Sequence, residues 1–196
     1  MSYFIKMTIK NNILFAALVL LWTLYVVGAL TVCTNNEITG EKNGLTNKPN
    51  VNAGTGVLVV ITQTSEFGFD CCGFVSEWTF HTAATGSFDV QVWRPQATEL
   101  YLLIGFNTLT STNPGTEEVR TIANGQRIRV NKNDYPGLHS TGGFIVTYFN
   151  EGSENIRGFT GITTAIGVST TLDTSGATVI NSDYAIKSKY IPIARE

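Results

Sequence analysis

Short runs in which every second residue is apolar dominate the chain from residue 57 onward. In SFDVQVWR, at 87–94, the alternation places two sets of side chains on opposite faces, with Phe88, Val90 and Val92 on one face and Asp89, Gln91 and Trp93 on the other. A period of two is that of a β-strand, because successive side chains of a strand point to opposite sides. Turn-forming segments such as ATGS, TNPGTEE and KNDYPG separate the runs. Their spacing of about 8–12 residues is typical of antiparallel sandwiches and barrels.

The complete set of runs predicts an all-β fold, an antiparallel β-sandwich of roughly eight or nine strands. The other runs are VLVVITQT, FVSEWTFHT, ELYLLIGFNTLT, QRIRVN, GFIVTYFN, ITTAIGVS, TVINS and YAIKSKYIPI. In FVSEWTFHT the alternation predicts that Phe74, Trp78 and Phe80 share one face, with Trp78 and Phe80 in the core. We expect a jelly-roll-like topology rather than an immunoglobulin one, because no cysteine follows Cys72 to complete the immunoglobulin spacing.

The N-terminal segment 1–32 has the pattern of an export signal. Lys6 and Lys10 precede a run without charged residues at 13–32. The run is about 20 residues long, enough for a helix to cross a bilayer, while the small residues ending at Ala29 suit a signal peptidase. Residues 1–32 are therefore a signal peptide or a signal-anchor helix, and membrane contact would occur through 13–32. Both alternatives predict a secreted protein or one on the extracellular face of a membrane.

The rest of the chain divides into a polar linker arm at 33–55 and a β-sandwich ectodomain at 56–196. The arm is rich in Asn, Gly and Thr and shows no hydrophobic periodicity. Over the whole chain, 13 basic residues stand against 15 acidic ones, so the net charge is −2. A balance this close to neutrality argues against nucleic acid as a partner.

The three cysteines are Cys33, Cys71 and Cys72, and in an exported protein we expect disulfides. A bond between adjacent cysteines is strained, so one of the pair is expected to join Cys33. That bond would close a loop of roughly 40 residues and contribute about 3–4 kcal/mol by the chain-entropy argument. The remaining cysteine is then free, bonded to another chain, or held in a strained vicinal bond. A zinc site is not predicted, because the pair has no second pair of ligands at a suitable spacing.

A candidate binding surface combines two parts of the sequence. Trp93 faces away from the predicted core, and Arg94 follows it, where it could stack on a ring or pair with Glu99. The most polar long loop, NKNDYPGLHSTGG at 131–143, adds Asp134, Tyr135 and His139. Asp134, His139 and Ser140 include the residue types of a hydrolase triad, but no G-x-S-x-G motif accompanies them. The sequence therefore predicts no enzyme, no cofactor and no metal site.

Part of the chain is similar to a known type of module. The motifs on which the similarity depends are Cys72-Gly73, Trp78, Phe80, Gly86, Val92 to Pro95, Gly105, and Asp134 with Gly137. Over about residues 56–193 they resemble an extracellular β-sandwich module (C-G-x-x-x-x-W-x-F followed by V-W-R-P) that recurs in cell-surface and secreted proteins of invertebrates. The resemblance implies a cell-surface β-sandwich, found beside adhesion-type domains, that binds rather than catalyses.

The sequence thus supports two hypotheses about function. The first is a recognition domain that binds a glycan or a protein at the cell surface. The alternative is a structural or matrix protein that self-associates into a homo-oligomer through strand edges or an intermolecular disulfide.

Overall fold

A computed structural model describes most of the ectodomain and parts of the arm. The described residues are 37–40, 50–51, 58–61, 67–140, 146–149, 155–160, 167–176, 178–181 and 183–193. They all belong to one compact unit, Cys33–Glu196. The expected signal or anchor helix at 1–32 lies outside the described residues, as does most of the predicted strand ITTAIGVS. Within the described ranges, no helix has the length and apolar character needed to cross a membrane.

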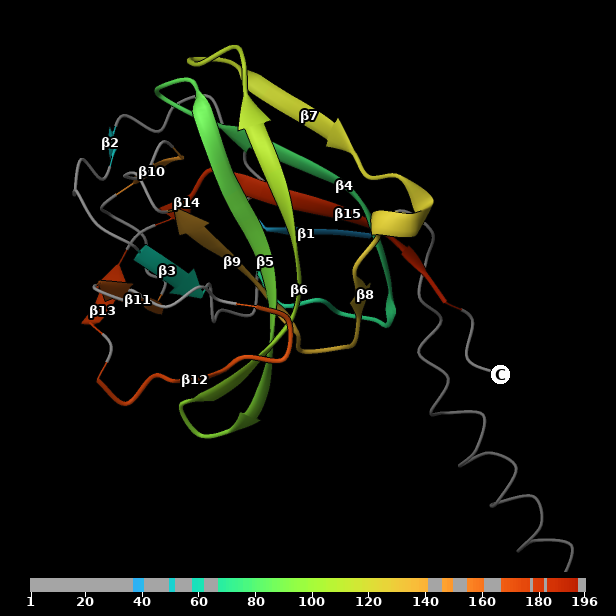
Figure 1. The fold of residues 1–196 in the computed structure, drawn as a ribbon, viewed down its shortest axis with the longest axis vertical. Coiled ribbons are helices and arrows are strands. Elements are labelled where there is room, and N and C mark those ends of the chain that lie inside the picture. Colours follow the sequence, from blue (N-terminus) through green and yellow to red (C-terminus); the bar gives the residue numbers. More distant parts are fainter. Residues whose placement is uncertain are drawn as a thin grey trace, which may run out of the picture. The chain divides into compact units, whose positions relative to one another are not determined.

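The described part of the chain is all-β, with antiparallel pairing in three sheets (Figure 1). The five-stranded sheet has the order β1 (Glu37–Gly40), β15 (Ile186–Pro192), β4 (Gly73–His81), β7 (Glu117–Thr121), with β8 (Arg129–Val130) also paired to β4. The seven-stranded sheet has the order β12 (Thr171–Asp173), β6 (Leu100–Ser111), β5 (Gly86–Ala97), β9 (Tyr135–Ser140), β3 (Leu58–Ile61), β11 (Asn155–Thr160), β13 (Thr178–Asn181). The three-stranded sheet has the order β14 (Asp183–Tyr184), β10 (Thr147–Phe149), β2 (Asn50–Val51), and one 3₁₀ turn, η1, covers Asn124–Gln126.

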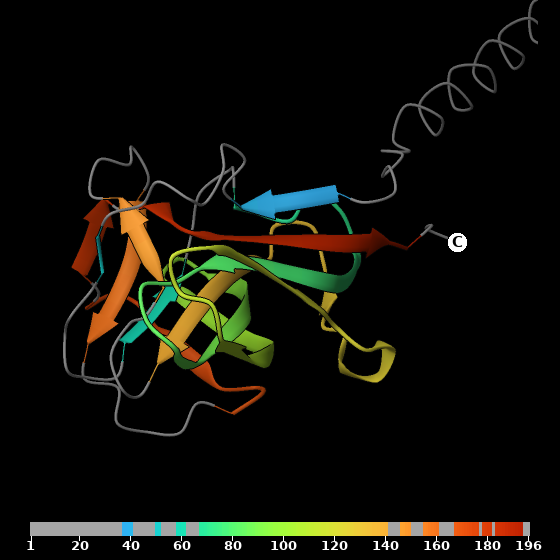
Figure 2. The same ribbon diagram turned by 90° about the horizontal axis from the view of Figure 1, so that it is seen from above.

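The five-stranded and seven-stranded sheets pack face to face around one hydrophobic core, as in a β-sandwich. Phe80 of β4 meets Phe88 of β5 edge to face, with ring centroids 5.1 Å apart. Figure 1 shows β4, β15 and β1 crossing behind the β5–β6 hairpin, and Figure 2 shows β1 and β15 together in one layer. The predicted all-β, sandwich-like architecture is thus confirmed.

Trp78 joins the two sheets through both its ring and its indole nitrogen. Its side chain is 0% exposed and belongs to the core, as does that of Phe80. The Trp78 Nε1 donates a hydrogen bond of 2.9 Å to Oδ1 of Asn107 on β6. The prediction that Trp78 and Phe80 are core residues is confirmed.

The predicted alternation of β4 is wrong at its first residues. Phe74 is 38% exposed, whereas its neighbour Val75 is fully buried. The cause is a β-bulge, because Glu77 pairs with Lys189 and Val75 with Tyr190, which leaves Ser76 as an extra residue in β4. One extra residue shifts the period of two, so Phe74 and Trp78 lie on opposite faces.

The loop predicted at 131–143 also needs correction, because it contains the strand β9. This strand lies inside the seven-stranded sheet, between β5 and β3. The strand was not predicted because Pro136 lies in it, and proline is rare in central strands. The pairing with β3 ends at Gly137, so the missing N–H of Pro136 costs that pairing nothing. The predicted linker arm at 33–55 also contains a strand, β1, which pairs with β15.

Candidate functional site

Trp93 does face away from the core, as predicted, but it is not an exposed aromatic surface. Its side chain is 0% exposed, and its Nε1 donates to Oε1 of Gln91 over 3.1 Å. The register of β6 explains the burial: Val92 pairs with Gly105 and Trp93 with Leu103, so β6 has one extra residue here. This bulge turns buried Leu103 onto the same face as Trp93. An aromatic platform at Trp93 is therefore ruled out.

Arg94 and Asp134, two further residues of the predicted surface, bind each other. Nε and Nη2 of Arg94 donate hydrogen bonds to the two carboxylate oxygens of Asp134, each with a length of 2.8 Å. The hydrogen bond to Asp134 raises the pKa of Arg94. Asp134 is buried and also accepts a bond of 2.7 Å from the backbone N–H of Asn131. The pair therefore holds the turn that leads into β9, with Tyr135 as the first residue of that strand, half-buried and opposite Trp93.

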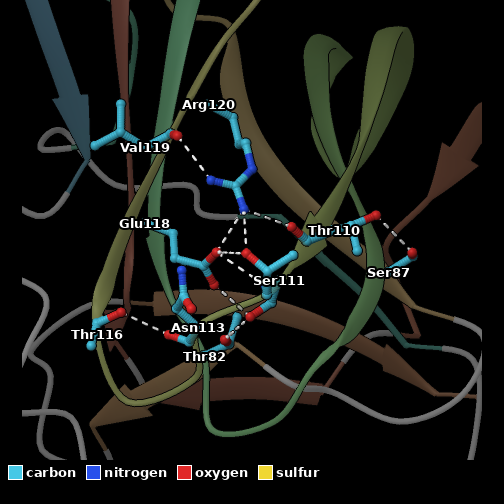
Figure 3. A network of polar contacts seen from close by, with 10 residues as sticks. Thr82, Ser87, Thr110, Ser111, Asn113, Thr116, Glu118, Val119 and Arg120 are labelled. Carbon is cyan, nitrogen blue, oxygen red and sulfur yellow. Dashed lines mark hydrogen bonds and ion pairs between the residues drawn. The ribbon is translucent and has the colours of Figure 1, made fainter.

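A second buried carboxylate, Glu118 of β7, is the centre of the network in Figure 3. It accepts hydrogen bonds from Oγ of Ser111 (2.6 Å), from the backbone N–H of Thr112 (3.1 Å) and from Arg120 (2.6 Å). The guanidinium of Arg120 also lies 5.5 Å from the centre of the Phe80 ring. Burial alone raises the pKa of a carboxyl group, but these bonds outweigh it and lower the pKa of Glu118 to about 2. With its oxygens occupied by protein donors, Glu118 anchors the β6–β7 connection.

A small cavity opens on the outer face of the seven-stranded sheet, the face turned away from the core. Its lining consists of Ser87, Phe88, Asp89, Thr108, His139 and Ser140, and its volume is about 140 Å³. Asp89 of β5 pairs with Thr108 of β6 on one side and with His139 of β9 on the other. The three side chains therefore form a row across three adjacent strands.

Hydrogen bonds connect the row. Oγ1 of Thr108 donates to Oδ1 of Asp89 over 2.7 Å, and Nδ1 of His139 lies 3.0 Å from Oδ2 of Asp89. The imidazole is mostly buried, with 8% of His139 exposed. The lining residues in the described part of the chain include one carboxylate and neither lysine nor arginine. It therefore offers several hydroxyls, an imidazole and a negative charge to whatever enters.

An exposed aromatic ring lies next to this row. Phe106 of β6 is 39% exposed and stands two residues before Thr108, so both side chains project from the same face of the strand. We call Phe106, Thr108, Asp89 and His139 the open end of the outer face. The cavity is smaller than the roughly 300–1,000 Å³ of pockets for drug-sized ligands. It is suited to one small group of a ligand whose remainder lies across the open end.

The sequence identified His139 but not its partners. It grouped His139 with Asp134, whereas the structure pairs His139 with Asp89 and Asp134 with Arg94. The alternation in SFDVQVWR did place Asp89 on the outward face. The contact between Asp89 and His139 could be predicted only by recognising β9 as a strand and knowing its register with β5. Phe106 gave no signal beyond its place in an apolar run.

The two adjacent cysteines differ in state. Cys71 is disulfide-bonded, and Cys72 is a free, partly exposed thiol. A vicinal bond between them is therefore absent. Cys33 lies outside the described residues. The next residue, Gly73, must be glycine for steric reasons, because a Cβ there would lie 2.5 Å from the carbonyl oxygen of Ile191 on β15.

Within the part of the chain that the structure describes, no group of three or more His, Cys, Asp and Glu side chains could hold a metal ion. Comparisons with known proteins also leave the site without a precedent. No protein-family model matches the chain. No curated protein sequence matches it, and no solved structure does. Any assignment of function therefore depends on the geometry of the open end.

Proposed function

We propose that this chain is an extracellular recognition domain, secreted or anchored through residues 13–32, that binds a neutral glycan at the open end. The observation that carries the proposal is the cavity of about 140 Å³ at Asp89 and His139 beside the exposed ring of Phe106. The resemblance to an invertebrate cell-surface module favours the same role. The fold would be jelly-roll-like, because sequence-distant neighbours such as β15 and β4 are typical of Greek-key connections.

A sugar ring suits the open end for two physical reasons. Its C–H face can pack on an aromatic ring such as Phe106, and its hydroxyls can bond to the carboxylate, hydroxyl and imidazole groups nearby. An acidic ligand is disfavoured, since Asp89 carries the only formal charge among the lining residues that the structure describes. A protein ligand could offer a single side chain to the cavity, but the described surface gives that reading no separate support.

Replacing Phe106 with alanine tests the proposal. We expect Phe106→Ala to weaken binding of a neutral glycan by about tenfold, the size of a lost aromatic contact. Because Phe106 is exposed, the free energy of unfolding should change by no more than about 0.5 kcal/mol. A neutral-glycan array would identify the sugar, and titration calorimetry on the full chain would give the affinities.

The matched control is Phe74→Ala, which removes a ring of similar exposure (38%) from the five-stranded sheet. It should bind like the unmodified protein. Equal affinity of Phe106→Ala and the unmodified protein would place the ligand elsewhere. An array without any hit, for protein shown to be folded by circular dichroism, would reject glycan binding.

One observation favours the alternative function, a structural protein that self-associates. Cys72 is free and partly exposed in a chain that we expect to be exported, where unpaired thiols oxidise to disulfides. We infer that Cys33 is the partner of Cys71, since it is the only remaining cysteine. Cys72 would then be available to a second copy of the chain.

Self-association predicts a covalent dimer that disappears when Cys72 is replaced by serine. On non-reducing gels of the exported protein, the dimer band should be present in the unmodified chain and absent from Cys72→Ser. Peptide mapping without reduction should show a Cys33–Cys71 link in both. Monomer alone in the unmodified chain, with sedimentation showing no assembly, would exclude this alternative.

A further inference from the structure

The hydrogen bond to Asp89 fixes which nitrogen of His139 carries hydrogen. Nδ1 lies 3.0 Å from Oδ2 of Asp89, and an ionised carboxylate can only accept hydrogen bonds. The hydrogen must therefore be on Nδ1. In the neutral ring, the other nitrogen, Nε2, is then left with a lone pair and acts as an acceptor.

Nε2 of His139 has no hydrogen-bond donor among the residues whose positions the structure describes. Among the residues that the structure describes, the bond through Nδ1 is the only side-chain hydrogen bond of His139. The side chain is about nine-tenths buried, with 8% of His139 exposed, and it lines the cavity. Nε2 is not among the fully buried unpaired atoms of the described residues, so it stays accessible from the cavity and can accept a hydrogen bond from a group that enters it.

Two neighbours fix the orientation of the imidazole. Asp89 orients the ring through Nδ1, and Thr108 orients Asp89 through the bond of 2.7 Å to Oδ1. Hydrogen bonds thus connect Thr108 to Asp89 and Asp89 to His139, and the lone pair on Nε2 of His139 remains available to a ligand. Thr108 and Asp89 are positioning residues, while His139 is the group that would touch the ligand.

The charges around Nε2 define the class of ligand. Among the described lining residues, only Asp89 on β5 and His139 are titratable. β6 contributes Thr108, and the sequence of β3, LVVI, contains no titratable residue. An ionised carboxylate, sulfate or phosphate has no hydrogen to donate to Nε2, and it would place a second negative charge near that of Asp89. A neutral hydroxyl instead supplies the hydrogen that Nε2 lacks.

Resting on the proposed glycan site, we propose that Nε2 of His139 accepts a hydrogen bond from a hydroxyl of a neutral sugar unit and so selects neutral sugars over acidic ones. The tautomer is tested first, without ligand. Long-range ¹H–¹⁵N NMR of the labelled full chain should show hydrogen on Nδ1 and none on Nε2 at about pH 8. Hydrogen on Nε2 in the neutral ring would overturn the inference.

Binding is tested with two variants of His139 that differ in the atom retained. In His139→Asn the side-chain amide can still donate to Asp89, but the position of Nε2 is vacated. In His139→Gln a polar atom is kept near Nε2. The probes are the methyl glycosides of glucose, galactose and mannose, with glucuronate as the acidic comparison. We expect His139→Asn to weaken binding of the preferred neutral sugar at least tenfold (about 1.4 kcal/mol), and His139→Gln to weaken it less.

A third variant separates positioning from structure. Thr108→Val keeps the shape of an exposed side chain but removes the donor to Asp89. It should fold normally, shift the ¹⁵N signals of the His139 ring, and weaken sugar binding several-fold. A purely structural role for Thr108 would leave those ring signals unchanged.

The outcomes distinguish this inference from the proposed function. If neutral sugars bind, Phe106→Ala weakens that binding and His139→Asn does not alter it, then the glycan site stands and the role of Nε2 is wrong. Preference for glucuronate would reject the ligand class. If no neutral sugar binds the unmodified protein, the proposed function and the inference fail together. If His139→Asn does not fold, unchanged ring signals and affinity in Thr108→Val would reject the inference.

Discussion

Replacing Trp78 with alanine is expected to lower the free energy of unfolding by about 3–5 kcal/mol, the range for truncating a fully buried tryptophan. The ring is 0% exposed and lies in the core between the two large sheets. Its loss would leave a cavity there and would deprive Oδ1 of Asn107 of its donor. Urea unfolding, followed by far-ultraviolet circular dichroism at several protein concentrations, would measure the change.

Trp78→Phe is the matched control. It keeps an aromatic ring in the core but removes the bond of 2.9 Å to Asn107. The expected loss is smaller, about 1–2 kcal/mol, since part of the volume and one hydrogen bond are removed. If alanine and phenylalanine destabilised the protein equally, the cavity argument would be wrong. If neither had an effect, Trp78 would not be in the core in solution.

Acid is expected to destabilise the fold through Glu118. Its pKa falls from 4.5 to about 2 in the folded state, a difference of about 3 kcal/mol between the two protonation states. Because the folded-state pKa is the lower one, the stabilisation is complete above the unfolded-state pKa and is lost as the pH falls through about 2. The free energy of unfolding should therefore decline between about pH 5 and pH 2.

Glu118→Gln should flatten this decline, because glutamine does not titrate in this range. Glu117→Gln is the matched control: Glu117 is the preceding residue of β7, is exposed, and pairs with Lys187 over 3.3 Å. It should leave the decline nearly unchanged. Measurements of unfolding free energy at several pH values for all three proteins would decide. An equally steep decline in Glu118→Gln would assign the acid sensitivity to other carboxylates.

The sequence predicted strands well where local pattern decides the outcome. In β5 the alternation correctly placed Phe88, Val90 and Val92 in the core. In β4 the same reasoning failed, because the extra residue at Ser76 becomes visible only through the register with β15. A bulge depends on the partner strand, and no pattern within one strand reveals it.

The candidate site was harder to predict because its residues come from three strands. His139 stood in what the sequence presented as a loop, and Pro136 obscured the strand that carries it. Trp93 was expected to face away from the core and was placed in the candidate binding surface, but a bulge in β6 brings Leu103 onto the same face, and both side chains are buried. The open end depends on pairings between segments about 50 residues apart, and such pairings have no local signature.

The row Thr108–Asp89–His139 exists only in one register of the β6–β5–β9 pairings. A slip of one residue would send one of its members to the opposite face and dismantle the cavity. A ligand held there would thus recognise the correctly registered sheet alone and would stabilise that register by mass action. A domain occupied by the proposed ligand would therefore resist unfolding and proteolysis better than the empty one.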